Sequence, residues 1–113
     1  MTILEVESEE GDGLVHVSLR GELDLSTVGK VEEELRRVEG QESPLVLLDL
    51  SRLSFLDSTG LRCVITAADR ARERDRRLVI VKGPDAVQRV FSITGLDDRL
   101  EMVDDPSGIR PDT

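Results

Sequence analysis

The chain has 113 residues, enough for one domain with a single buried core. Its 24 acidic and 15 basic residues give a formal net charge of −9, which disfavours direct binding to nucleic acid or to anionic membranes. No apolar stretch approaches the roughly 20 residues of a spanning helix, and the N-terminus lacks the features of a secretory signal. We therefore expect a cytoplasmic protein.

The rare residue types exclude several kinds of site. Cys63 is the only cysteine and His16 the only histidine, so an internal disulfide and the usual Cys/His metal sites are excluded. Tryptophan and tyrosine are absent from the sequence, which removes the usual stacking platforms for bases and sugars. We expect no metal and no other cofactor.

The N-terminal third is predicted to form a hairpin followed by a helix. Residues 3–6 are a short strand candidate, and residues 9–13 form a turn because their glycines allow positive φ. Residues 15–19 alternate apolar and polar side chains, the period of a half-buried strand. Residues 21–24 are then expected to leave the sheet. The apolar side chains of 28–38 recur at helical spacing and predict a helix.

The middle of the chain carries the strongest structural signal. Residues 45–48 and 78–81 are continuous apolar runs, which suit parallel strands covered on both faces. Between them, the apolar side chains of residues 61–68 follow helical spacing. Strand, helix and strand in this order predict a βαβ unit with a right-handed crossover.

The C-terminal part is predicted to add a helix and an edge strand. A helix begins near Pro84 and buries apolar side chains up to Phe91, and residues 100–103 can add a last strand. From residue 104 onward the apolar content is too low for packing, so we expect one domain over 1–103 and a disordered tail over 104–113. The predicted fold class is α/β, a small mixed β-sheet packed with α-helices.

The sequence Asp57-Ser58-Thr59-Gly60 brings polar residues to the point where a buried strand gives way to a helix. In open α/β sheets, function gathers at the carboxyl ends of parallel strands. The structural interpretation is a helix cap, because Asp57 or Ser58 can accept hydrogen bonds from the first free amides. A helix start also favours phosphate through those amides and the macrodipole, so the two interpretations are compatible.

A catalytic serine lacks its partners here. A nucleophile elbow needs glycine two residues before and two residues after the serine, and around Ser58 only Gly60 qualifies. His16, the sole candidate base, belongs to an upstream strand, and nothing in the sequence brings it near. A phosphate-binding loop of the Gly-x4-Gly-Lys-Ser/Thr type is also absent. We expect a protein that is not an enzyme.

Four segments together resemble a known family. They are Gly-Glu-Leu-Asp at 21–24, Leu-Asp-Leu-Ser at 48–51, Phe-Leu-Asp-Ser-Thr-Gly-Leu at 55–61, and residues 87–96. In this order they resemble the STAS domain from about residue 3 to residue 103. More narrowly, they are similar to the single-domain anti-anti-sigma factors, also called anti-sigma factor antagonists.

The resemblance implies a switch controlled by phosphorylation. In this family the serine at the helix start, here Ser58, is phosphorylated by an anti-sigma factor with serine kinase activity, and a serine phosphatase reverses the modification. The unmodified protein binds the anti-sigma factor and frees the sigma factor. Thr59 stands where a second serine is common, so the resemblance leaves open which hydroxyl is modified. The implied partner-binding residues are Asp24, Asp57, Ser58, Thr59, Gly60 and Leu61.

Two alternatives remain beside this hypothesis. The chain can be a STAS scaffold subunit of a stress-sensing assembly, or a binding module that responds to a small ligand or nucleotide. An enzyme that uses Asp57 or Ser58 is the least favoured alternative. For the antagonist we expect a monomer when the protein is free.

Overall fold

The computed structural model describes residues 3–111, so the first two residues of the predicted domain and the last two of the predicted tail lie outside the described residues. Its sheet has five strands in the order β1-β2-β3-β4-β5; the first pair is antiparallel and the others are parallel. This confirms the predicted mixed sheet packed with helices. The elements are β1 (Leu4–Gly11), β2 (Leu14–Leu23), α1 (Val28–Glu39), β3 (Leu45–Leu56), α2 (Ser58–Glu73), β4 (Arg77–Val81), α3 (Asp85–Ile93), the short 3₁₀ helix η1 (Leu96–Asp98) and β5 (Met102–Val103).

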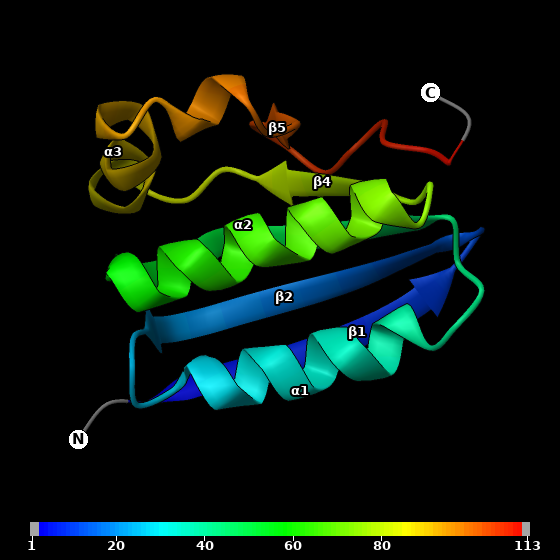
Figure 1. Ribbon diagram of the computed structural model, residues 1–113, viewed down its shortest axis with the longest axis horizontal. Helices are drawn as coiled ribbons and strands as arrows, with labels where there is room; N and C mark the ends of the chain where they lie inside the picture. Colours follow the sequence, from blue (N-terminus) through cyan, green and yellow to red (C-terminus); the bar gives the residue numbers. More distant parts are fainter. Residues whose placement is uncertain (1–2, 112–113) are drawn as a thin grey trace.

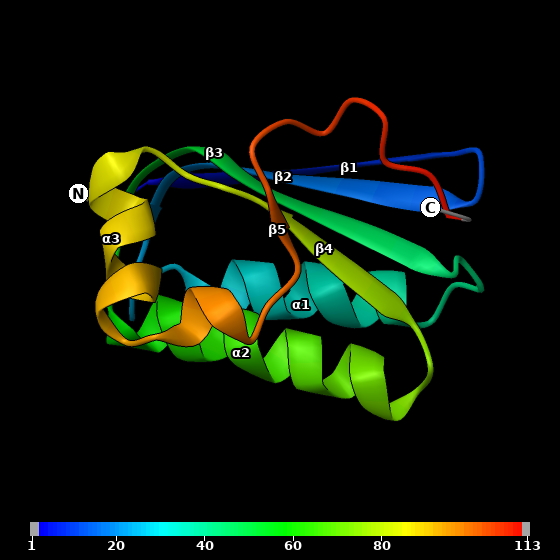
Figure 2. The same cartoon turned by 90° about the horizontal axis from the view of Figure 1, so that it is seen from above.

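The main core lies between one face of the sheet and the helices. Figure 2 shows α1 and α2 side by side beneath the sheet, with α3 at one end of the molecule. The apolar side chains that α1 was predicted to bury are all buried, from Val28 to Val38. On α3, Phe91 is fully buried and joins the same core. Helical spacing in the sequence thus identifies the face of each helix that packs on the sheet.

The opposite face of the sheet has a smaller apolar cluster of its own. Leu45 and Leu47 of β3 lie there with two valines of β4, because successive side chains of a strand point to opposite faces. Ile109 packs against this cluster, and Figure 2 shows the C-terminal segment crossing the face that α1 and α2 leave open. Within the described part of 104–113, Ile109 therefore packs on the sheet, whereas most of its neighbours are exposed. The disorder of this tail stays a prediction.

Several strands are longer than their sequence patterns predict. Strand β1 extends to Gly11, and its tight turn needs positive φ at Asp12 (53°) and Gly13 (81°). Apolar and acidic side chains alternate along the first part of β1, but the adjacent acids Glu9 and Glu10 before Gly11 break this period and resemble a turn. Strand β2 continues to Leu23, so most of the 21–24 segment stays in the sheet instead of leaving it. It also pairs with β3 through two register shifts, so β3 extends as far as Leu56.

The packing of the C-terminal segment can be tested at Ile109. We expect Ile109→Ala to lower the free energy of unfolding by about 1 kcal/mol, because the substitution removes apolar area that covers the second cluster. The control is Ile93→Ala, since Ile93 is 77% exposed and its truncation should cost less than about 0.5 kcal/mol. Urea denaturation measures both values. Equal effects of the two substitutions would contradict a packed C-terminal segment.

Candidate functional site

The site is built around the start of α2. Strand β3 ends at Leu56, helix α2 begins at Ser58, and Asp57 between them is the N-cap residue in an extended conformation. The Oδ1 atom of Asp57 accepts a hydrogen bond from the Gly60 amide at 2.9 Å, and its backbone oxygen accepts one from the Leu61 amide at 2.9 Å. Asp57 is therefore the cap, and the helix start does not depend on the Ser58 hydroxyl.

Asp57 also joins α2 to the loop that follows β2. Its Oδ2 atom accepts a hydrogen bond from the Leu25 amide at 3.2 Å, and its own amide donates to the Leu23 carbonyl at 3.2 Å. These bonds bring the loop at Asp24 against the helix start. Two of the sequence motifs, which lie more than 30 residues apart in the chain, thus form one surface.

The loop at Asp24 is itself held by local hydrogen bonds. The Asp24 Oδ1 atom accepts hydrogen bonds from the Ser26 amide at 2.9 Å and from the Ser26 hydroxyl at 2.7 Å. Below it, the buried Thr27 hydroxyl donates to the Glu22 carbonyl at 2.8 Å and accepts from the Asp24 amide at 3.0 Å. Sequence reasoning missed Thr27, the N-cap residue of α1, whose hydroxyl holds this loop and makes no capping hydrogen bond to the helix.

The two hydroxyls of the motif differ in their surroundings. Ser58 is exposed, and its side chain has no hydrogen-bond partner among residues 3–111. Thr59 is half-buried. Within the same range the backbone amides of Ser58 and Thr59 also lack acceptors, as is usual for the first turn of a helix. The exposed hydroxyl therefore stands beside two unused N–H donors at the positive end of the helix dipole.

Gly60 and Leu61 lie underneath this surface. A Cβ atom on Gly60 would stand 2.7 Å from Leu23 Cγ and 2.7 Å from Leu56 Cδ1, so only glycine lets α2 approach the end of β2 this closely. Leu61 is 8% exposed and belongs to the main core. The structure gives both residues a packing role beneath the loop at Asp24.

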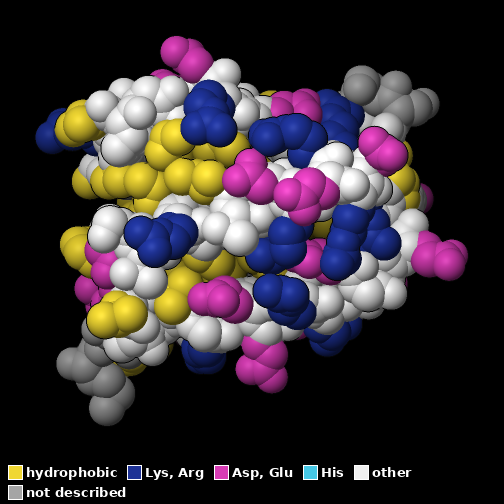
Figure 3. Space-filling view, viewed as in Figure 1, with side chains coloured by type: hydrophobic (Ala, Val, Ile, Leu, Met, Phe, Trp, Pro, Cys, Tyr) yellow, Lys and Arg dark blue, Asp and Glu magenta, His cyan; other side chains and the backbone are white. Residues whose placement is uncertain are grey.

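Exposed apolar side chains flank the helix start. Leu25 is 74% exposed and Phe55 is 47% exposed. Figure 3 shows hydrophobic side chains at the end of the molecule where α2 begins in Figure 1. Phe55 faces solvent because the register of β3 skips Ser54, so that Leu53 and Leu56 point inward.

The remaining reactive side chains lie elsewhere. His16 Nε2 lies 2.9 Å from Asp49 Oδ2 on the sheet face opposite α2. Burial raises the pKa of Asp49, but hydrogen bonds from Ser51 and His16 outweigh it, and the net pKa is lowered. Burial raises the pKa of the Cys63 thiol to about 11, so this buried thiol is protonated at neutral pH.

Neither a cluster of metal ligands nor a spanning helix occurs in the described part of the chain. Residues 3–111 contain no group of three or more His, Cys, Asp or Glu side chains that could hold a metal ion. Over the same range, every helix is too short or too polar to cross a bilayer.

The close approach at Gly60 gives a matched pair of substitutions. We expect Gly60→Ala to lower the free energy of unfolding by about 1–3 kcal/mol, because the new methyl group overlaps Leu23 and Leu56. Gly29→Ala is the control: its Cβ meets nothing within 4 Å on an exposed face of α1, and alanine should raise stability by up to about 1 kcal/mol. Thermal or urea unfolding measures both. A neutral Gly60→Ala would contradict the packing described here.

Comparison with known proteins gives a consistent result. The STAS domain family profile matches residues 5–107. The anti-sigma-B factor antagonist of Listeria monocytogenes is 33% identical over 99 residues, which cover 88% of this chain and 86% of that protein. A crystal structure of an anti-sigma factor antagonist from Mycobacterium paratuberculosis superposes with a TM-score of 0.86 at 26% identity, covering 92% of this chain and 88% of that one.

The antagonist SpoIIAA of Bacillus has the same fold in two solved forms. Its unphosphorylated form gives a TM-score of 0.73 and its phosphorylated form 0.67, each at 22% identity and over 88% of this chain. The matches cover 88% and 91% of those two chains. The family profile, the relative from Listeria and the shared fold agree, and the chain belongs to the STAS domain family, among relatives named anti-sigma factor antagonists.

Proposed function

We propose that this protein is an anti-sigma factor antagonist controlled by phosphorylation of Ser58. Its unphosphorylated form binds an anti-sigma factor that has serine kinase activity, and this binding releases a sigma factor. Phosphorylation of Ser58 weakens the complex, and a serine phosphatase restores the binding form. The protein acts in the cytoplasm as a binding protein rather than as an enzyme, and it is a monomer when free. The names of its relatives support this class of function.

The observation that carries the proposal is the separation of the hydroxyl from the cap. Ser58 is exposed, while Asp57 makes the hydrogen bonds that begin α2. A phosphoryl group on Ser58 therefore removes no hydrogen bond that the helix start needs. The unused amides of Ser58 and Thr59 can donate to phosphate oxygens at the positive end of the helix dipole. The half-burial of Thr59 favours Ser58 as the modified residue.

The same geometry explains why modification would weaken binding. We assign the partner contact to Asp24, Asp57, Ser58 and Thr59, with Leu25 and Phe55 as apolar contacts around them. Phosphate adds about −1.5 to −2 charges at pH 7, beside the carboxylates of Asp24 and Asp57. If this added negative charge lies against acidic groups or an apolar surface of the partner, the binding free energy becomes less favourable by several kcal/mol. A change of 10²-fold in affinity needs only about 3 kcal/mol.

Gly60 and Leu61 complete the proposed site from below. Because both are buried, they support the partner surface by holding the loop at Asp24 against α2. Substitutions there should change partner binding through the shape of the loop and should also lower stability, whereas substitutions at exposed Ser58 should change binding alone.

The assignment of the phosphoacceptor is tested with the cognate kinase and ATP. We expect one phosphate per molecule, located on Ser58 by mass spectrometry of proteolytic peptides, and no phosphate on Ser58→Ala. Thr59→Ala is the control and should be modified as the wild type is. Equal modification of Ser58→Ala and wild type would overturn the assignment, and loss of modification only in Thr59→Ala would move it to Thr59.

The switch itself is tested by calorimetric titration with the anti-sigma factor. Ser58→Ala should retain binding within a few-fold, whereas Ser58→Asp should weaken it at least tenfold, about 1.4 kcal/mol, because it places a charge beside Asp57. Thr66→Asp is the control, since Thr66 is exposed on α2 two turns further along and its substitution adds the same charge. Equal weakening of partner binding by Ser58→Asp and Thr66→Asp would contradict a local switch.

The scaffold alternative is tested separately by size-exclusion chromatography. A large homo-assembly would favour a scaffold subunit over the antagonist.

A further inference from the structure

A second surface on this molecule, a groove at the C-terminal end of α2, is rich in arginine. The groove has a cavity volume of about 240 Å³ and lies between α2, the beginning of β4 and the segment that follows η1. Four of its lining residues are arginines, namely Arg72, Arg76, Arg77 and Arg99, and Glu101 is the only acid among them. The chain as a whole carries a net charge of −9. The arginine groove is therefore a basic site on an acidic protein.

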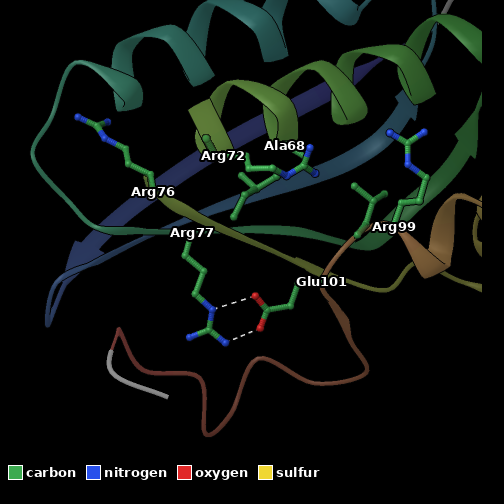
Figure 4. Close-up of a pocket in the computed structure, with 9 residues that line it drawn as sticks. Ala68, Arg72, Arg76, Arg77, Arg99 and Glu101 are labelled. Carbon is green, nitrogen blue, oxygen red and sulfur yellow. Dashed lines mark hydrogen bonds and ion pairs between the residues drawn. The ribbon is translucent and has the colours of Figure 1, made fainter. Parts of the chain in front are cut away.

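Figure 4 shows how these side chains are arranged. Arg72 extends from α2 toward the side where Arg99 lies, while Arg77 points away toward Glu101. Arg77 is held by Glu101 through two hydrogen bonds, of which the one from Nε to Oε1 measures 2.9 Å. Arg76 Nη1 donates to the Glu39 carbonyl at 2.5 Å. Arg76 and Arg77 are thus fixed within the fold.

Arg72 and Arg99 remain available to a ligand. Arg72 pairs with Asp69 at 3.1 Å, but both side chains are largely exposed, and exposed pairs of this kind contribute little. The Arg99 side chain has no hydrogen-bond or ion-pair partner within residues 3–111. The end of a helix attracts basic residues through its dipole, and this accounts for Arg72. Arg99 comes from a different element, directly after the short 3₁₀ helix η1.

The floor of the groove is apolar. Ala68 and Ala71 of α2 line one side of this floor. Leu78 of β4 and Leu100 of the segment before β5 line the other side. Figure 3 shows Lys and Arg side chains, interspersed with Asp and Glu side chains, over the half of the molecule where α2 ends. A short apolar floor between guanidinium groups is suited to an aliphatic side chain flanked by carboxylates.

We propose that the arginine groove binds an acidic segment of a partner protein, with one aliphatic side chain on the floor and carboxylates on Arg72 and Arg99. A short segment touches only the groove, whereas a nucleic acid would extend over the acidic surface around it. A small inorganic anion would leave the apolar floor uncovered. Charge complementarity and the floor together favour the acidic segment.

The position of the groove makes it independent of the helix start. Arg72 lies fourteen residues after Ser58 on the same helix, a separation of about 20 Å at 1.5 Å per residue. Charges on the surface are screened over about 8–10 Å at physiological salt. Modification of Ser58 therefore leaves the groove open, and a second partner can bind whichever form of Ser58 is present.

The test uses a short fluorescein-labelled peptide in which Asp and Glu flank a central leucine, and a matched peptide with Asn and Gln in their place. We expect fluorescence anisotropy to give a Kd on the order of 10 µM for the acidic peptide at low salt, weakening as salt rises. The amide-containing peptide should bind at least tenfold more weakly. Absence of binding by the acidic peptide, or equal binding by both peptides, would overturn the proposal.

Matched variants locate the binding. The double variant Arg72→Ala, Arg99→Ala should bind the acidic peptide at least tenfold more weakly than the wild type does. The control is Arg36→Ala, Arg89→Ala, which removes the same charge at exposed positions outside the groove. Equally weakened peptide binding in both double variants would overturn the proposal, because it would show that binding depends only on the net charge of the protein. Circular dichroism verifies that each variant is folded.

Two further measurements distinguish the groove from the helix start and the acidic segment from a nucleic acid. In an amide NMR titration the peptide should shift resonances around Ala71, Leu78 and Leu100, and Ser58→Asp should bind it within twofold of wild type. Shifts centred on Ser58, or tighter binding by a single-stranded oligonucleotide, would contradict the acidic segment as the occupant. Failure of the kinase experiments would leave these results unchanged, because none of them depends on Ser58 phosphorylation.

Discussion

The carboxylate of Asp57 connects the two halves of the candidate site. One oxygen caps α2 through the Gly60 amide, and the other holds the Leu25 amide of the loop after β2. A single side chain thus fixes both the direction in which the helix starts and the position of a loop that is distant in sequence. Without this carboxylate, the first turn of α2 would lose its cap, and the loop at Asp24 would lose its side-chain hydrogen bond to the helix start.

This arrangement separates the residues that stabilise the helix start from the residue proposed to be phosphorylated. Asp57 and Gly60 carry the local structure, one through hydrogen bonds and the other through close packing against Leu23. Ser58 lies between them in sequence and contributes neither a capping hydrogen bond nor close packing. The proposed phosphate on Ser58 would therefore break no hydrogen bond of the helix start, and its effect would fall on the binding of a partner at this surface.

The sequence predicted the elements of the fold better than their ends. The helical spacing of apolar residues from Val28 to Val38 identified α1, and the two continuous apolar runs identified β3 and β4. In each case the pattern of apolar residues in the sequence matches the side chains that the fold buries. The ends of β2 and β3 depend on register shifts between neighbouring strands, and a single strand carries no sign of these. For the same reason, the apolar residues around Phe55 do not reveal from the sequence that its side chain faces solvent.

The candidate site was predictable in part. Its location followed from a polar segment at the carboxyl end of a buried strand. The sequence could not show which residue caps the helix, because aspartate and serine both cap helices and only the geometry distinguishes Asp57 from Ser58. The bond from Leu25 to Asp57, the pair of His16 with Asp49 and the packing of Ile109 all join residues far apart in the chain, so local patterns could not reveal them.

The acidic edge strand β1 has a consequence for the behaviour of the protein at high concentration. A strand at the border of a sheet offers unpaired amides and carbonyls to any other strand, and natural proteins often protect such borders with charge. Here the exposed side chains of Glu5, Glu7 and Glu9 recur along the border. Two copies that met along β1 would align these carboxylates against one another. Repulsion between these carboxylates therefore disfavours growth of the sheet by addition of a second copy along β1.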